Sequence, residues 1–196
     1  MEATLELLGT GVGIAYLWLE YRASIYLWVA GIIMPAIYIF VYYHAGLYAD
    51  VAINIYFLLA ALYGLACWMR GHDTAHTKPA LPIAHTPRRV LPTLTLVTAL
   101  AWVGIARLLT ELTDSNVPWS DAFTTALSIV GMWMLARKYV EQWLVWIAVD
   151  VASALLYAYK ELYFTSGLYA IYAVVAWFGY RKWLQLMNQE THDTSL

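Results

Sequence analysis

Long apolar runs separated by short polar connections dominate the sequence. Their apolar positions do not alternate with polar ones at every second residue, as they would in the strands of a membrane barrel. The pattern therefore predicts seven apolar helices, with boundaries good to a few residues. They cover residues 4–20, 25–43, 49–69, 90–109, 119–136, 143–159 and 163–180.

The composition indicates that the solvent around these helices is lipid. The chain is 62% hydrophobic and only 12% charged, whereas about a quarter of the residues in a soluble domain are charged. We therefore predict an all-α integral membrane protein. Some predicted helices are shorter than the roughly 20 residues that a bilayer requires, so aromatic residues at their ends are expected to complete them at the membrane interface. Trp18, Trp28, Trp119 and Trp183 are assigned to this interfacial belt.

Lysine and arginine are distributed unequally between the two sets of connections. With the N-terminus outside, the inner connections and tail hold nine of the eleven basic residues, which predicts an outer N-terminus and a cytoplasmic C-terminus in a multi-pass inner-membrane protein. The first helix follows no basic stretch and no cleavage site, so we expect it to be retained. The nine residues are Arg22, Arg70, Lys78, Arg88, Arg89, Arg137, Lys138, Arg181 and Lys182.

The third and seventh predicted helices resemble each other. LYADVAINIYFLLAALYGLACW (residues 47–68) aligns at a constant offset of 115 with LYFTSGLYAIYAVVAWFGYRKW (residues 162–183), matching Leu-Tyr, an aromatic-Gly pair and a final Trp. Upstream, one gap aligns WLEYR (residues 18–22) with MLARK (residues 134–138). Matched positions at a fixed spacing favour an internal repeat over the chance likeness of apolar helices.

The fourth predicted helix lies between two three-helix repeats. A three-helix unit begins and ends on opposite sides of a membrane, so one extra crossing gives the second copy the direction of the first. We predict two parallel three-helix bundles joined by a linker helix, a 3+1+3 plan known from transporters that bind substrate at mid-membrane. The parts are a first repeat (1–70), a linker region (71–118) with the linker helix near 90–109, a second repeat (119–185) and a polar, frayed cytoplasmic tail (186–196).

The stretch EQWLVWIAVD (residues 141–150) places a carboxylate in the middle of the sixth predicted helix. Trp143, Trp146 and Asp150 lie within about 60° of one another on a helix, and Ser153 and Tyr157 continue that face. An ionised Asp at this depth costs about 2.5–3.5 kcal/mol on insertion scales. We expect Asp150 to face a polar cavity beside an indole, a combination that suits a flat cationic ring. The alternative is a carboxylate hydrogen-bonded to a neighbouring helix.

Other chemistry is weakly represented. His72, Asp73 and His76, in a loop with three prolines, lack a further close metal ligand and are predicted to be solvated. The chain has no P-loop and no H-E-x-x-H or G-x-S-x-G motif, so neither ATP hydrolysis nor enzymatic activity is expected. No metal or cofactor is predicted. The single cysteine excludes an intrachain disulfide.

These residues resemble the PnuC family of bacterial vitamin transporters. The likeness includes RKYVEQWLVWIAVD, GLYAD and the YG…W ending, in order, and extends over nearly the whole chain. It implies a SWEET-like fold, a homotrimer, and facilitated diffusion of nicotinamide riboside or a related vitamin into the cell, where phosphorylation traps it.

The resemblance also implies the substrate-binding residues. The family's WxxW pair is Trp143 and Trp146, and the polar position seven residues after the first Trp, commonly Asn, is Asp150. The other implied positions are Asn54 where Gln is usual, Ala61 at a polar position, Met34 where Asn is usual, and Tyr63 and Trp68 in the YGWYxW ending, which lacks one Trp here.

We therefore expect a transporter that imports a cationic B vitamin. Nicotinamide riboside is the family default and thiamine a close second, because both carry a cationic ring. The reduced number of amide side chains favours a ligand without a ribose. The alternative from another class is a substrate-capture subunit of an ATP-driven vitamin importer. The expected partners are the vitamin and the lipid bilayer, with no nucleic acid.

Overall fold

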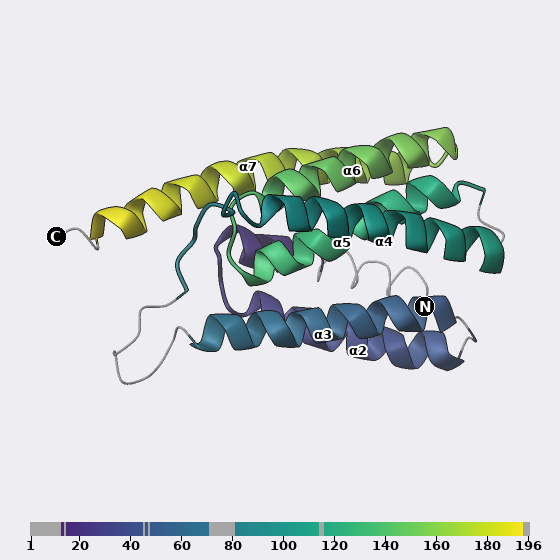
Figure 1. The fold of residues 1–196 in the computed structure, drawn as a ribbon, viewed down its shortest axis with the longest axis horizontal. Helices are drawn as coiled ribbons and strands as arrows, with labels where there is room; N and C mark the ends of the chain where they lie inside the picture. The colour runs from purple at the N-terminus through teal and green to yellow at the C-terminus, as the bar shows by residue number, and fades with distance from the viewer. Residues whose placement is uncertain are drawn as a thin grey trace. The chain divides into compact units, whose positions relative to one another are not determined.

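The computed structural model describes residues 13, 15–44, 46, 48–70, 81–113 and 116–193 of the chain, and these are mostly helical (Figure 1). Residues 15–21 are helical. The second to sixth predicted helices are confirmed within a few residues, whereas most of the first lies outside the described residues. The helices are α2 (Leu27–His44), α3 (Tyr48–Arg70), α4 (Leu91–Leu112), α5 (Pro118–Ala136), α6 (Gln142–Tyr159) and α7 (Tyr163–Asp193).

The last helix is longer than predicted. α7 continues beyond residue 180 as far as Asp193, so the expectation of a frayed segment after residue 185 is wrong up to that residue. Within the described residues, four stretches are long and apolar enough to cross a membrane: Leu27–His44, Val51–Met69, Leu91–Leu112 and Gln142–Tyr159. Membrane crossing by α5 and α7 stays a prediction.

By its internal packing the chain divides into two units, Met1–Pro82 and Ile83–Leu196. In the first unit α2 packs along α3. Trp28 is fully buried, and its ring lies so close to α3 that a Cβ on Gly64 would be 2.3 Å from it. The same indole meets Trp68 edge to face, with ring centroids 5.6 Å apart and an angle of 87°. A glycine on α3 thus allows the two helices to enclose a tryptophan.

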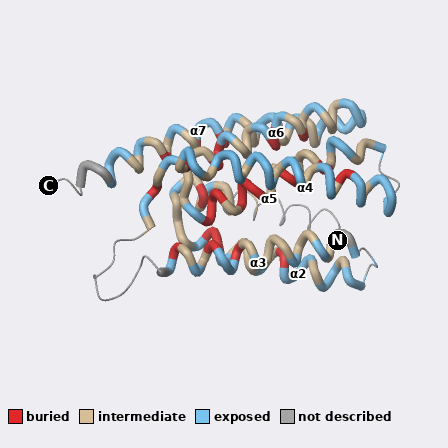
Figure 2. The backbone as a smooth tube through the Cα atoms, in the orientation of Figure 1, coloured by how far each residue is buried: buried red, intermediate tan, exposed pale blue. Residues whose placement is uncertain are grey.

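In the second unit α4 packs on α5, and α6 packs on both α5 and α7. α5 contains many of the buried residues of this unit (Figure 2). Several are small, among them Ala122, Ala126 and Gly131, and small residues let the backbones of membrane helices approach closely. α5 therefore supplies much of the packing surface for α4 and α6.

The Trp–Gly–Trp contact of the first unit recurs in the second. Trp143 of α6 is 1% exposed, and a Cβ on Gly179 of α7 would lie 2.7 Å from its ring. Its ring meets Trp183 edge to face, with centroids 5.9 Å apart and an angle of 84°. Each of the three residues follows its counterpart by 115 positions. The internal repeat is therefore confirmed at the level of local packing.

Backbone geometry repeats at the same spacing. Left-handed residues occur at Ala23 (φ 50°) and Lys138 (φ 54°) before α2 and α6, and at Gly46 (φ 73°) and Glu161 (φ 60°) after them. Both helices have 18 residues. Matching entry turns and exit turns show that the repeat extends through the connections and not only the helices.

The one-residue gap in the sequence alignment of residues 18–22 with residues 134–138 is wrong. The Arg22 guanidinium lies over the Trp18 ring at 4.6 Å, and Arg137 lies over Trp133 at 5.9 Å. Residues 18–22 therefore correspond to residues 133–137 at the same offset of 115, without a gap. The gapped alignment pairs Trp18 with Met134, because a leucine follows each of them. It thereby misses the aromatic match of Trp18 with Trp133.

Burial contradicts the interfacial assignment for two of the four tryptophans. Trp18 and Trp119 are 54% and 50% exposed, and for them the interfacial belt stays a prediction. Trp28 and Trp183 are fully buried, so their assignment to the belt is wrong. Their positions near helix ends suggested the interface, but each ring is held within its own unit by helix packing.

Candidate functional site

A carboxylate near the middle of α6 is buried beside α7. Asp150 is 9% exposed, and Ser153 one turn later is 7% exposed. Asp150 interacts electrostatically with Tyr169 of α7. Within the described part of the chain it takes part in no ion pair. Because a buried carboxylate without a cation is costly, its surroundings favour a cationic ligand.

Tyr169, which interacts with Asp150, belongs to a group of three neighbouring tyrosines. Tyr157 and Tyr169 stack with ring centroids 5.3 Å apart and an angle of 13°, and their side chains are hydrogen-bonded. Tyr172 meets Tyr169 edge to face at 5.9 Å. All three are half-buried and offer π faces, which attract cations. We name Asp150, Tyr157, Tyr169 and Tyr172 the α6–α7 polar cluster.

The two indoles predicted to share a face with Asp150 contact different neighbours. Trp143 packs against Gly179 of α7, as described above. Trp146 is half-buried and lies against α5, where a Cβ on Gly131 would be 3.4 Å from its ring. α6 therefore directs Trp146 to α5 and Asp150 to α7, although their angular positions are close. Substrate binding by either indole stays a prediction.

The five candidates of the first unit fall into two groups. Ala61 is fully buried and lies 3.4 Å from the Cβ position of Gly31, while Trp68 is 4% exposed and packs on Trp28. These two belong to the packing of α2 on α3. Their role in binding stays a prediction, as it does for the three half-buried or exposed candidates, Met34, Asn54 and Tyr63.

Sequence reasoning missed the α7 tyrosines of the cluster. At the repeat offset of 115, Asn54 corresponds to Tyr169 and Phe57 to Tyr172. Transferring the candidate Asn54 to the second unit would have found Tyr169. It also missed Gln142, which is fully buried and whose two side-chain amide atoms lack a hydrogen-bond partner in the part of the chain that the structure describes. Only its correspondence to the apolar Leu27 distinguishes it in the sequence.

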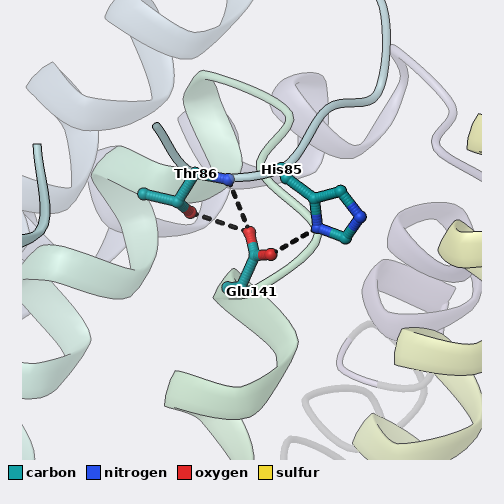
Figure 3. A network of polar contacts seen from close by, with 3 residues as sticks. All are labelled: His85, Thr86 and Glu141. Carbon is teal, nitrogen blue, oxygen red and sulfur yellow. Dashed lines mark hydrogen bonds and ion pairs between the residues drawn. The ribbon is translucent and has the colours of Figure 1, made fainter. Parts of the chain in front are cut away.

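A second polar network holds the segment before α4 (Figure 3). Glu141 Oε1 lies 2.6 Å from His85 Nδ1, and its Oε2 accepts hydrogen bonds from the backbone N–H and the hydroxyl of Thr86, both at 2.8 Å. Burial acts to raise the pKa of Glu141, but the hydrogen bonds from His85 and Thr86 outweigh it and lower this pKa below its ordinary value. The ionised carboxylate is therefore the form that the network stabilises.

The same segment is fastened at two further points. Ala84 donates to the Lys138 carbonyl at 3.1 Å and accepts from the Val140 N–H at 3.0 Å, which forms an isolated parallel bridge. Ile83 N–H donates to Glu190 of α7 at 3.0 Å. Burial lowers the pKa of the Lys138 ammonium, and Glu190 partly opposes that shift. These contacts join the start of α4 to the α5–α6 turn and to the end of α7.

Two open grooves lie among α4, α5 and α6, apart from the polar cluster. One, of about 670 Å³, is lined by residues that include Trp102, Phe123 and Tyr159, and the other, of about 550 Å³, by residues that include Leu94, Leu127 and Val145. Neither is lined by Trp146 or Asp150. Their apolar walls fit acyl chains better than a charged vitamin.

The structure offers no support for a metal centre within the residues it describes. No group of three or more His, Cys, Asp or Glu side chains is close enough there to hold an ion. His72, Asp73 and His76 lie outside the described residues.

Comparisons with known proteins point to one family. Residues 3–185 match the pattern of the family described as nicotinamide mononucleotide transporter. The nicotinamide riboside transporter PnuC of Escherichia coli is 26% identical over 92% of this chain and 84% of its own. The riboflavin/roseoflavin transporter RibM of Streptomyces davaonensis is 27% identical over 91% and 83%.

A solved structure has the same fold. The crystal structure of the vitamin B3 transporter PnuC superposes with a TM-score of 0.65, and the match covers 91% of this chain and 79% of that one at 23% identity.

Proposed function

Because the chain belongs to the nicotinamide mononucleotide transporter family, we propose that it is a vitamin transporter that imports a cationic water-soluble B vitamin, with nicotinamide riboside first. The family consists of transporters and not enzymes, and the relatives with known substrates are vitamin carriers. The observation that supports a cationic substrate is Asp150, a buried carboxylate without an ion pair in the described residues, which interacts with Tyr169 of a three-tyrosine group.

The relatives suggest two kinds of substrate, which differ in charge. Nicotinamide riboside carries a pyridinium, and thiamine, the second candidate, a thiazolium, whereas riboflavin is neutral. A carboxylate and π faces stabilise a cation more than a neutral ring, so the α6–α7 polar cluster favours the first two. Riboflavin is kept as a test ligand because RibM is a relative of similar identity.

A binding panel tests the substrate. Purified protein is titrated by calorimetry with nicotinamide riboside, thiamine and riboflavin, and Asp150→Asn is compared with wild type. Loss of a buried charge partner is expected to weaken binding of the cationic ligand on the order of 30-fold or more. Asp121→Asn is the matched control, because Asp121 pairs with Lys160 at 3.6 Å and both are partly exposed. Equal affinity of Asp150→Asn and wild type for the cation would exclude Asp150 from the site.

We propose facilitated diffusion as the mode of transport, because the sequence has no P-loop with which to hydrolyse ATP. Proteoliposomes that contain the purified chain alone should equilibrate labelled nicotinamide riboside without ATP or an imposed ion gradient. Tight binding without uptake would instead support the substrate-capture subunit of a larger importer. Uptake that requires an ion gradient would replace diffusion with coupled transport.

The arrangement in the membrane belongs to the same proposal. The matching local geometry of the two units supports a 3+1+3, SWEET-like plan with parallel halves, and the bias of lysine and arginine supports an outer N-terminus. Cysteine labelling from each side of the membrane tests the orientation. The family resemblance supports a homotrimer, and light scattering of the purified protein in detergent tests it.

A further inference from the structure

Gln142, the first residue of α6, contains an unexplained polar group. Its side chain is 0% exposed, and neither amide atom has a hydrogen-bond partner among the described residues. A carboxamide has two donor hydrogens and two acceptor lone pairs. Leaving such a group buried and unsatisfied is costly, and each case in a native protein requires an explanation.

The repeat shows that packing alone does not require an amide at this position. The corresponding residue of the first unit is Leu27, which is also 0% exposed. The indole Nε1 atoms of Trp28 and Trp143 differ from the Gln142 amide in this respect. Both are buried without a hydrogen-bond partner among the described residues, so this feature is common to the two repeats. Gln142 is a polar exception at a position where leucine fills the same space.

Gln142 lies in one row with two other polar residues of α6. Gln142, Trp146 and Asp150 follow one another at intervals of four residues, so they occupy neighbouring positions over about 12 Å of the helix. The Nε1 atom of Trp146 is also buried and has no hydrogen-bond partner within the described ranges. Along the helix the row carries an amide, an N–H donor and a carboxylate in succession, although the Trp146 ring lies against α5 and Asp150 interacts with α7.

We propose that Gln142 binds the hydroxyl-bearing part of the substrate while Asp150 binds its cationic ring, an inference that rests on the proposed transport function. A carboxamide donates and accepts, as sugar hydroxyls do. A site built to hydrogen-bond a hydroxyl discriminates against analogues that lack it, because its own polar groups then stay unpaired. The substrate class is therefore a cationic ring joined to a sugar. This reverses the expectation of a ligand without a ribose.

The test separates the sugar from the ring. Wild type, Gln142→Leu and Gln142→Met are titrated with nicotinamide riboside and with N-methylnicotinamide, which has the same pyridinium but no sugar. Both substitutions replace the carboxamide by an apolar side chain of similar size, and leucine is the residue of the first repeat. Gln185→Leu, at an exposed position of α7, is the matched control. Melting temperatures are measured on the same samples.

Loss of the amide should weaken nicotinamide riboside binding about 10-fold, leave N-methylnicotinamide binding unchanged, and leave the melting temperature equal or higher. Nicotinamide riboside affinities within 2-fold of wild type, or equal losses for both ligands, would overturn the role of Gln142. If wild type binds riboflavin and not nicotinamide riboside, the proposed substrate is wrong. Wild type and the Gln142 variants are then compared in their binding of riboflavin and of lumichrome, which lacks the sugar-derived chain.

Discussion

Replacing Gly179 by alanine tests whether the Trp143 ring is a fixed part of the fold. The added Cβ would lie 2.7 Å from three atoms of this ring, whereas ordinary van der Waals contact begins at 3.4 Å. The ring would have to withdraw by about 0.7 Å. It cannot do so easily, because Trp143 is 1% exposed and Trp183 lies against it at 5.9 Å.

The magnitude follows from two opposing effects. Overpacking of a filled interior costs about 1–3 kcal/mol, while Gly→Ala in a helix gains up to about 1 kcal/mol. Gly167→Ala on the same helix supplies the control, because nothing in the described structure lies within 4 Å of its Cβ position. We therefore expect Gly179→Ala to be less stable than Gly167→Ala by about 1–3 kcal/mol.

The assay is thermal unfolding in detergent, followed by tryptophan fluorescence and near-ultraviolet circular dichroism. A chain of this size shifts by about 2–4 °C per kcal/mol, so the two variants should differ by several degrees. The near-ultraviolet signal of Gly179→Ala should also change, because the geometry of the Trp143–Trp183 pair is disturbed. Equal melting temperatures and an unchanged signal would show that the ring is free to move, and the packing interpretation of Trp143 would be refuted.

Four further substitutions test other parts of the structure. Glu141→Ala should lower stability by about 1–3 kcal/mol and speed hydrogen exchange at the Thr86 amide; unchanged exchange would contradict the network. Since hydrogen bonds lower the pKa of Glu141, its stabilisation is present above the ordinary carboxyl pKa and lost as pH falls through the lowered one, which a pH series of melting temperatures checks. Glu161→Gly should raise stability by about 1 kcal/mol, because φ is 60° there, and Gly46→Ala should lower it similarly; the opposite signs would refute the repeated turn. Trp146→Ala should remove most of the ligand-induced change in tryptophan fluorescence, and an unchanged signal would place the ring contact elsewhere.

The helices could be predicted because apolar runs in this chain coincide with helices, but contacts distant in sequence could not. The end of α7 illustrates the limit. Its last two turns are polar and suggested a frayed tail, whereas Glu190 accepts a hydrogen bond from Ile83 in the described structure. The burial of Trp28 was missed for a similar reason, since nothing local indicates that Gly64 of another helix admits its ring.

The candidate site was predictable where a residue type contradicts its surroundings. A carboxylate inside an apolar helix is conspicuous, and Asp150 was identified for that reason. Tyr169 was not, because the chain contains sixteen tyrosines and the residue type alone carries little information. Its position became informative only when the structure showed it stacked on Tyr157 and interacting with Asp150.

The repeat separates two kinds of candidate residue. Trp143 and Trp68 have counterparts of the same type and geometry in the other unit, and buried Ala61 corresponds to buried Ala176. Residues that have the same type and geometry in both units serve the packing of one helix on the next, which both units require.

Recognition of the substrate is a different requirement. A vitamin with a charged ring at one end and a sugar at the other has no internal symmetry, so identical groups from two halves could not match both ends. The binding groups must therefore be sought where the repeat fails. Asp150 corresponds to Pro35 and Gln142 to Leu27. Both differences lie on α6 and introduce polar groups into buried positions, which is why we assign the charge and the hydroxyl contacts to these two residues rather than to the shared tryptophans.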